Sequence, residues 1–257
     1  MTTGSDFSLT RDINNNMTHA PYLLQGALLL LRPGYKRFIL IPLACNLALF
    51  IVSMLVLISY LNHAAAQYMQ WIPDWLQAIE VIMWFIVGFG IFFLYSLTFT
   101  SITNLLAAPF NGFLSEKIQA DTTGEPLPDD TLWSMTLRTL KREFQKLLYF
   151  VLYGLLVSII LFIISFIPLL NVCAPILGIA WVCWSLGIQY IDYAADNNHI
   201  EFQALRRWCA KRRLRVVMYG GTVLLITLIP IVNVIVMSAA VAGGTLFWLN
   251  EKQHTAS

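Results

Sequence analysis

Two long stretches without a single charged residue dominate this sequence. They run from Phe38 to Leu61 and from Val81 to Phe110. A helix crosses the hydrocarbon core of a membrane with roughly 20 predominantly apolar residues. Each stretch therefore predicts a transmembrane helix, at 38–61 and 81–110. The whole chain is 58% hydrophobic and only 12% charged, and helices are the form in which such segments satisfy their backbone groups in lipid. We predict an all-α integral membrane protein.

The second half of the sequence contains an internal repeat. The hexapeptide Ile167–Val172 (IPLLNV) recurs 62 positions later as Ile229–Val234 (IPIVNV), and each copy interrupts an apolar stretch. Proline disfavours the helix interior, because it lacks an N–H group and its ring clashes with the preceding turn. The arm 216–229 would reach about 21 Å, short of the ~30 Å hydrocarbon core. We therefore predict two Pro-broken helical hairpins that partly insert into the membrane, at 149–190 and 216–249. Two ordinary hairpin pairs that cross fully remain the alternative.

Two segments between the apolar stretches are polar and rich in basic residues. They are the polar segment 111–148 and the basic segment 191–215, and each contains a basic amphipathic pattern, at 131–150 and 202–215. Helices of this kind usually lie along a membrane surface. Residues 1–20 are expected to form a disordered N-terminus. We predict that the chain as a whole, 1–257, forms a single membrane domain.

The distribution of basic residues predicts the orientation in the membrane. All 16 Lys and Arg residues lie within 1–37, 111–148, 191–215 or the C-terminal tail, and none lies in the loop 62–80. Positive charge is retained on the cytoplasmic side. Both termini and the two polar segments are therefore predicted to be cytoplasmic, in a multi-pass protein.

The sequence argues against several classes of function. It contains no nucleophile–base motif, no zinc-protease motif and no phosphate-binding loop, so we predict neither an enzyme nor a nucleotide-driven pump. The four cysteines and four histidines show no metal-like clustering, so no metal or other cofactor is expected. A net charge of +2 is too small to indicate a nucleic-acid partner.

A short turn before the first long stretch is a candidate anion site. Pro33 and Gly34 bend the chain, and Lys36 and Arg37 follow at the start of the expected helix. Cations there oppose the helix dipole unless an anion is held at the same place. The alternative is that both side chains meet lipid phosphates at the membrane surface.

Several motifs resemble those of one known family, the CysZ family of bacterial sulfate permeases. The stretches that carry the resemblance are Asn104–Glu116 (NLLAAPFNGFLSE), Lys141–Lys146 (KREFQK), Gln189–Tyr193 (QYIDY) followed by Asp196 and Asn197, Pro33–Phe38 (PGYKRF) and the two IPxxN motifs. The resemblance extends over about residues 20 to 250, in the same order and spacing. This sequence has Lys36 where the family commonly has arginine. The planar guanidinium group, which can donate two hydrogen bonds to an oxyanion, is therefore absent at this position.

The resemblance implies uptake of sulfate across the bacterial inner membrane for cysteine biosynthesis, by a homo-oligomer that lies among membrane lipids. It implies an anion site at Gly34, Lys36 and Arg37, which Arg32 and Tyr35 of the same stretch complete. Residues at the junction of the cytoplasmic segments and the membrane would line the transport pathway: Asn104, Asn111, Glu116, Lys117, Arg142, Asp192 and Asp196. The acidic members need cationic partners, for which Arg142 and Lys117 are the candidates. A non-transporting membrane scaffold that binds anionic lipid through its basic helices is the alternative.

Overall fold

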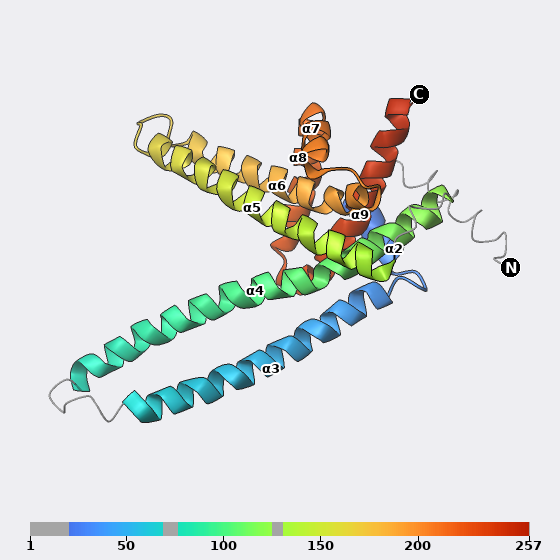
Figure 1. The fold of residues 1–257 in the computed structure, drawn as a ribbon. Helices are drawn as coiled ribbons and strands as arrows, with labels where there is room; N and C mark the ends of the chain where they lie inside the picture. The colour runs from blue at the N-terminus through green and yellow to red at the C-terminus, as the bar shows by residue number, and fades with distance from the viewer. Residues whose placement is uncertain (1–20, 69–76, 125–130, 257) are drawn as a thin grey trace. The chain divides into compact units, whose positions relative to one another are not determined.

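Helices joined by short turns make up most of the described part of the chain. The computed structural model describes residues 21–68, 77–124 and 131–256, so the expected disorder of 1–20 lies outside the described residues. The helices are α2 (Tyr22–Leu30), α3 (Arg37–Tyr68), α4 (Gln77–Thr123), α5 (Leu132–Ser165), α6 (Cys173–Asn197), α7 (Phe202–Lys211), α8 (Arg213–Thr227) and α9 (Pro230–Ala256) (Figure 1). Within these ranges there is no β-strand.

The chain divides into two compact units. Unit 2 comprises Leu40–Ala107, and unit 1 comprises the rest of the chain on either side of it. In unit 2 the middle parts of α3 and α4 run antiparallel, because Ser53 Oγ lies 2.9 Å from Tyr95 Oη and the rings of Phe50 and Phe99 meet edge to face at 5.8 Å. The predicted transmembrane segments 38–61 and 81–110 lie within these two helices.

Unit 1 is built around α6, which packs against α5, α8 and α9. The helices approach closely where glycines replace larger side chains. A Cβ atom added to Gly220 of α8 would lie 1.8 Å from the carbonyl oxygen of Cys183 on α6, and one added to Gly26 of α2 would lie 2.5 Å from the carbonyl oxygen of Ala239 on α9. Small residues let helix backbones pack in van der Waals contact, which is how helices associate in membranes.

The proline repeat breaks the chain in both copies, but the two breaks differ. After α5, the first copy forms an open turn in which Leu169 adopts a positive φ of 77°, and α6 runs back alongside α5 (Figure 1). In the second copy the chain leaves α8 at Thr227, and Pro230 is already the first residue of α9. Proline is well tolerated there because the first N–H groups of a helix have no intrahelical partner.

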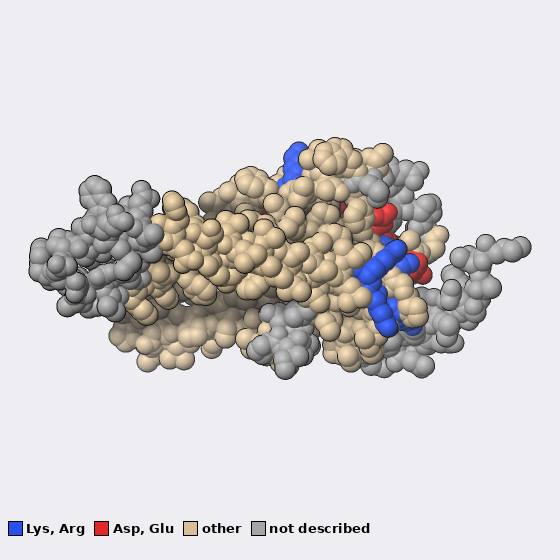
Figure 2. Space-filling view, turned by 90° about the horizontal axis from the view of Figure 1, so that it is seen from below, with Lys and Arg blue, Asp and Glu red and all other residues tan. Residues whose placement is uncertain are grey.

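Large parts of the exposed surface of α3, α4, α5 and α6 are apolar. Segments of α3 (Arg37–His63), α5 (Trp133–Ser165) and α6 (Cys173–Asn197) are long and apolar enough to cross a membrane, and Leu169 at the tip of the first hairpin is 90% exposed. Figure 2 shows one face of the molecule, on which few charged side chains are visible and residues that are neither Lys, Arg, Asp nor Glu cover most of the described surface. A soluble protein does not expose apolar surface on this scale. The fold is that of an all-α integral membrane protein.

Partial insertion of the first hairpin stays a prediction. The apolar side chains at its tip are exposed, as insertion requires. Both of its arms also reach the length of a membrane span.

The close packing of α8 on α6 leads to a first prediction. Gly220→Ala should lower the unfolding temperature of the purified protein, because the new methyl group overlaps the backbone of Cys183, and overpacking typically costs about 1–3 kcal/mol. Gly221→Ala is the matched control, since its Cβ would lie 3.6 Å from Cys183 Sγ and should leave stability unchanged or slightly higher. Equal unfolding temperatures for the two variants would contradict the packing of these helices.

Candidate functional site

The turn between α2 and α3 contains the predicted anion-binding stretch. Gly34 adopts a φ of 93°, which glycine reaches without the steric cost that a Cβ atom imposes. The N–H of Arg32 donates to Leu29 O at 3.1 Å, and that of Tyr35 to Arg32 O at 3.3 Å. These bonds fold the chain back on itself and hold Arg32, Lys36 and Arg37 on one compact turn.

Tyr35 fixes this turn to α4. Its ring is buried, and its hydroxyl donates a hydrogen bond to the carboxylate of Asp121. Lys117 Nζ lies 3.0 Å from the same carboxylate and 5.1 Å from the centre of the Tyr35 ring. Burial raises the pKa of the Tyr35 hydroxyl well above its ordinary value, and the hydrogen bond to Asp121 raises it further. Tyr35 is therefore a protonated structural anchor, and Lys117 supports it.

The cations of the turn remain available. Lys36 and Arg37 are exposed and Arg32 is half-buried, and among the described residues no ion pair joins any of the three to a carboxylate. The N–H groups of Phe38 and Ile39 donate to carbonyl oxygens of the turn, at 3.0 and 3.1 Å. These two amides are therefore not available to an anion at the turn, which the side chains of Lys36 and Arg37 can reach.

A second group of predicted residues forms a buried ladder of ion pairs between α5 and α6. On α6, Asp192 Oδ1 accepts hydrogen bonds from Arg142 Nε at 2.9 Å and Nη2 at 2.7 Å. Lys146 Nζ lies 3.3 Å from Asp192 Oδ2, and one helical turn away Arg138 Nε lies 3.5 Å from Asp196 Oδ1. Asp192 and Lys146 are only 1% and 2% exposed. We call this group the α5–α6 ladder.

Residues of α4 and the end of α6 complete the polar surroundings of the ladder. Asn111 Nδ2 donates to Tyr193 Oη at 3.3 Å, and Asn197 Nδ2 donates to the carbonyl oxygen of Gly112 at 3.1 Å. Lys146 Nζ lies 4.2 Å from the centre of the Tyr193 ring. Three helices are thereby joined by one network of buried polar groups.

The charged face of α5 is turned inward, and its apolar face outward. Arg142 and Lys146 are buried against α6, whereas Leu137, Phe144 and Leu147 are exposed. The amphipathic segment expected at 131–150 is also continuous with the apolar arm that follows it, since α5 runs unbroken from Leu132 to Ser165. Burial of the charged side fits a helix surrounded by lipid, where the apolar side gains nothing by facing the protein.

The structure brings four of the predicted pathway residues together: Asn111, Arg142, Asp192 and Asp196. Arg142 is indeed the partner of an acidic residue, and Lys117 pairs with Asp121 beside the turn. Glu116 is half-buried on α4. Asn104 belongs to α4, but its side chain lies outside the described residues.

Sequence reasoning missed several members of the ladder: Arg138, Glu143 and Lys146. Glu143 Oε1 lies 2.5 Å from Lys146 Nζ, so the ladder holds as many carboxylates as cations. The available signal was the spacing, because Arg138, Arg142 and Lys146 recur every four residues, as do Asp192 and Asp196. Residues four apart lie on the same face of a helix, so two complementary charged faces could have been paired. Chemically, the ladder is balanced in charge, whereas the three cations of the turn pair with no carboxylate in the described part of the chain.

Comparison with known proteins gives consistent matches over most of the chain. The family described as "Sulfate transporter CysZ/Etoposide-induced protein 2.4" matches residues 22–238. Proteins named "Sulfate transporter CysZ" are similar to this chain in Pseudomonas aeruginosa (37% identity, covering 91% of this chain and 96% of the relative), Pseudomonas fluorescens (39%; 90% and 92%) and Pectobacterium atrosepticum (34%; 97% and 90%).

The ladder predicts a large effect on stability from one carboxylate. Asp192→Ala should destabilise the protein by about 3–5 kcal/mol, because it leaves Arg142 and Lys146 buried without their partner. The measurement is the unfolding temperature of the purified protein in detergent.

Lys141→Ala is the control for this variant. Lys141 lies on the exposed side of the same helix, and its loss should leave the unfolding temperature near that of the wild type. An Asp192→Ala protein as stable as the control would show that the ladder does not hold α5 to α6.

Proposed function

The chain belongs to the family of the sulfate transporter CysZ and etoposide-induced protein 2.4, and on this basis we propose that it is a sulfate permease. It is a transport protein and not an enzyme. In this proposal it takes up sulfate across the bacterial inner membrane for cysteine biosynthesis, as a channel or an ion-coupled carrier, without ATP.

The observation that carries the proposal is the uncompensated positive charge of the turn between α2 and α3. Arg32, Lys36 and Arg37 lie on one turn, and no carboxylate of the described residues pairs with them, whereas the cations of the α5–α6 ladder are all engaged. A divalent oxyanion loses strong hydration when it binds, so it needs several charge-assisted hydrogen bonds in return. Arg37 offers a planar fork for two oxygens, and Lys36 a compact charge with three donors. We propose that sulfate binds here first.

We propose further that the pathway follows the polar residues of α4 and α6. Polar and ionisable groups at membrane depth usually face a bundle interior or a water-filled path. Asn111 lies next to the ladder, and Lys117 lies next to the turn, so this stretch of α4 connects the proposed anion site at the turn with the buried polar groups around the ladder. Glu116 lies on the helix between them, and Asn104 lies further along α4.

The proposed arrangement in the membrane follows from the placement of charge. Both termini are cytoplasmic in this proposal, because every Lys and Arg lies in segments assigned to that side. The first hairpin inserts its uncharged tip into the membrane, and the exposed apolar side chains of α5 contact lipids or further copies of the chain in a homo-oligomer.

The transport function is tested by uptake of radiolabelled sulfate into liposomes that contain the purified protein. The wild type should take up sulfate in a saturable manner, and Lys36→Ala/Arg37→Ala should reduce uptake by at least about tenfold, since each lost charged hydrogen bond is worth roughly 1.5–3 kcal/mol. Lys211→Ala/Arg213→Ala removes two exposed cations elsewhere in unit 1 and should behave like the wild type.

Other outcomes of the uptake experiment separate the alternatives. Uptake that is insensitive to the Lys36/Arg37 substitutions would move the binding site away from the turn. No uptake above that of empty liposomes, by a folded and inserted protein, would refute the permease and favour the membrane scaffold.

Partial insertion of the first hairpin can be tested with a native thiol. Cys173 lies at the tip and is exposed, whereas Cys183 and Cys209 are buried, and burial raises the pKa of the Cys209 thiol and so suppresses its reactive thiolate. In a Cys45→Ala background, a membrane-impermeant maleimide should label Cys173 neither in intact spheroplasts nor in inverted vesicles, but should label it after denaturation. Labelling in spheroplasts would mean that the hairpin crosses the membrane.

A further inference from the structure

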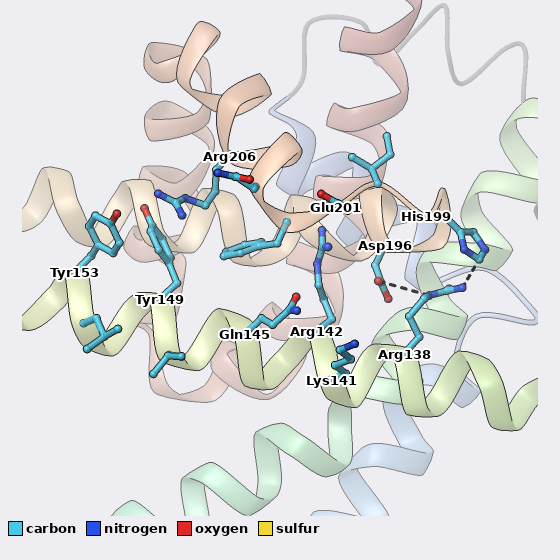
Figure 3. A pocket seen from close by; sticks show the side chains of 15 residues that line it. Arg138, Lys141, Arg142, Gln145, Tyr149, Tyr153, Asp196, His199, Glu201 and Arg206 are labelled. Carbon is cyan, nitrogen blue, oxygen red and sulfur yellow. Dashed lines mark hydrogen bonds and ion pairs between the residues drawn. The ribbon is translucent and has the colours of Figure 1, made fainter.

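A pocket of about 660 Å³ lies beside the ladder, between α5, the end of α6 and the start of α7. Figure 3 shows its side chains, with Arg138, Lys141 and Arg142 on α5 and Arg206 on α7. The turn that is proposed to bind sulfate contributes none of its lining residues. The pocket is therefore a separate feature of unit 1.

One end of the pocket is cationic. Arg138, Lys141 and Arg142 line this end, and Arg206 lines the pocket further along, so the whole pocket holds four Lys and Arg side chains against two carboxylates, those of Asp196 and Glu201. Arg142 and Arg138 are engaged by the ladder. Lys141 and Arg206 differ from them, since no ion pair within the described ranges joins either to a carboxylate. Arg206 instead lies over the rings of Tyr149 and Tyr153, 4.0 and 5.1 Å from their centres, which holds its guanidinium in place at the pocket.

The other end of the pocket is apolar and open to the outside. The next turns of α5 line it with Leu148, Tyr149, Leu152 and Tyr153, and Leu148 and Leu152 are 51% and 56% exposed. The same helix continues with exposed Leu155 and Leu156. Along α5 the lining thus passes from Arg138, Lys141 and Arg142 to an apolar stripe within a few turns. Figure 3 shows that Arg206 of α7 lies beside the later part of this lining, next to Tyr149 and Tyr153.

Along α5 the charged residues are followed by apolar ones, as the lipid phosphates of a membrane are followed by its hydrocarbon core. Lys146 is the last charged residue of α5, and the chain carries no charge from Leu147 to Ser165. Hydrocarbon can therefore surround α5 beyond the turn of Tyr149, which places Lys141, Arg142 and Arg206 in the polar layer that contains the lipid phosphates. Basic residues at the end of an apolar stretch commonly occupy this level.

We propose that this pocket binds one anionic phospholipid. The phosphate group lies against Arg206, on the side of the pocket that faces Lys141, and an acyl chain lies along Leu148 and Leu152. Free sulfate or phosphate offers the same tetrahedral oxyanion, but neither would make use of the apolar wall. The proposal goes beyond sulfate transport and does not depend on it, because Lys141 and Arg206, which hold the lipid, belong neither to the turn nor to the proposed pathway.

The test measures lipid binding to the full-length protein in detergent by native mass spectrometry. Phosphatidylglycerol is the anionic probe, and phosphatidylcholine is the zwitterionic one. Lys141→Ala/Arg206→Ala should weaken phosphatidylglycerol binding by about tenfold or more, since a basic residue near an anionic lipid contributes about 1 kcal/mol. Arg207→Ala/Lys211→Ala removes two exposed cations of α7 that do not line the pocket, and it should bind like the wild type.

A second arm distinguishes a lipid from a free oxyanion. Leu152→Ser should weaken phosphatidylglycerol binding while leaving the binding of inorganic sulfate unchanged. Equal binding of the two lipids, or phosphatidylglycerol binding that is insensitive to the loss of Lys141 and Arg206, would overturn the proposal. A third result would also overturn it: sulfate binding is lost in Lys141→Ala/Arg206→Ala, and phosphatidylglycerol binding is unchanged in Leu152→Ser. The pocket would then hold a free oxyanion instead of a lipid. Sulfate uptake measured on the same variants reports on the transport function separately.

Discussion

The arrangement of unit 1 depends on the ion pairs that the buried carboxylate of Asp192 makes with α5. This carboxylate lies on α6, accepts two hydrogen bonds from Arg142 and pairs with Lys146. A charge removed from water is tolerated only when its partners are close and well aligned. α5 must therefore turn Arg142 and Lys146 toward α6, and this rotation leaves its apolar side chains on the outside. The same pairing places α5 where Arg138 can reach Asp196 and where the pocket beside α7 is formed.

The cations of the ladder and those of the two proposed sites consequently have different roles. Those of the ladder are balanced by carboxylates and hold helices together, so they add little to the electrostatic attraction of an anion. Lys36 and Arg37 at the turn, and Lys141 and Arg206 at the pocket, have no carboxylate partner among the described residues. The turn is thereby suited to a small transported oxyanion, and the pocket to a lipid phosphate whose chain needs the adjacent apolar wall. The two proposed sites use the same charge chemistry and differ in what surrounds the charge.

Sequence patterns were sufficient for the fold class and for part of the candidate site. The uncharged stretches located α3 and α4, and Pro168 and Pro230 marked the two breaks, because their effects are local. The inward rotation of α5 could not be predicted in the same way. Periodicity shows that Arg142 and Phe144 lie on different sides of a helix, but in a membrane either side can face outward. The hydrogen bond from Tyr35 to Asp121 joins residues 86 positions apart, and no local sequence pattern predicts such a contact. The two copies of the proline repeat also look alike in sequence, yet only the first forms an open turn.

The rotation of α5 is tested most directly by the accessibility of this helix at the level of the ion pairs. Nitroxide spin labels at Phe144, which is 65% exposed, and at Leu147, which is 55% exposed, would be placed in the protein reconstituted in liposomes. Collisions with oxygen, which concentrates in lipid, are compared with collisions with a water-soluble nickel complex. We predict that both labels collide with oxygen and are shielded from nickel. Strong collisions with nickel at both positions would show that this side of α5 faces water, and would contradict the rotation that Asp192 imposes.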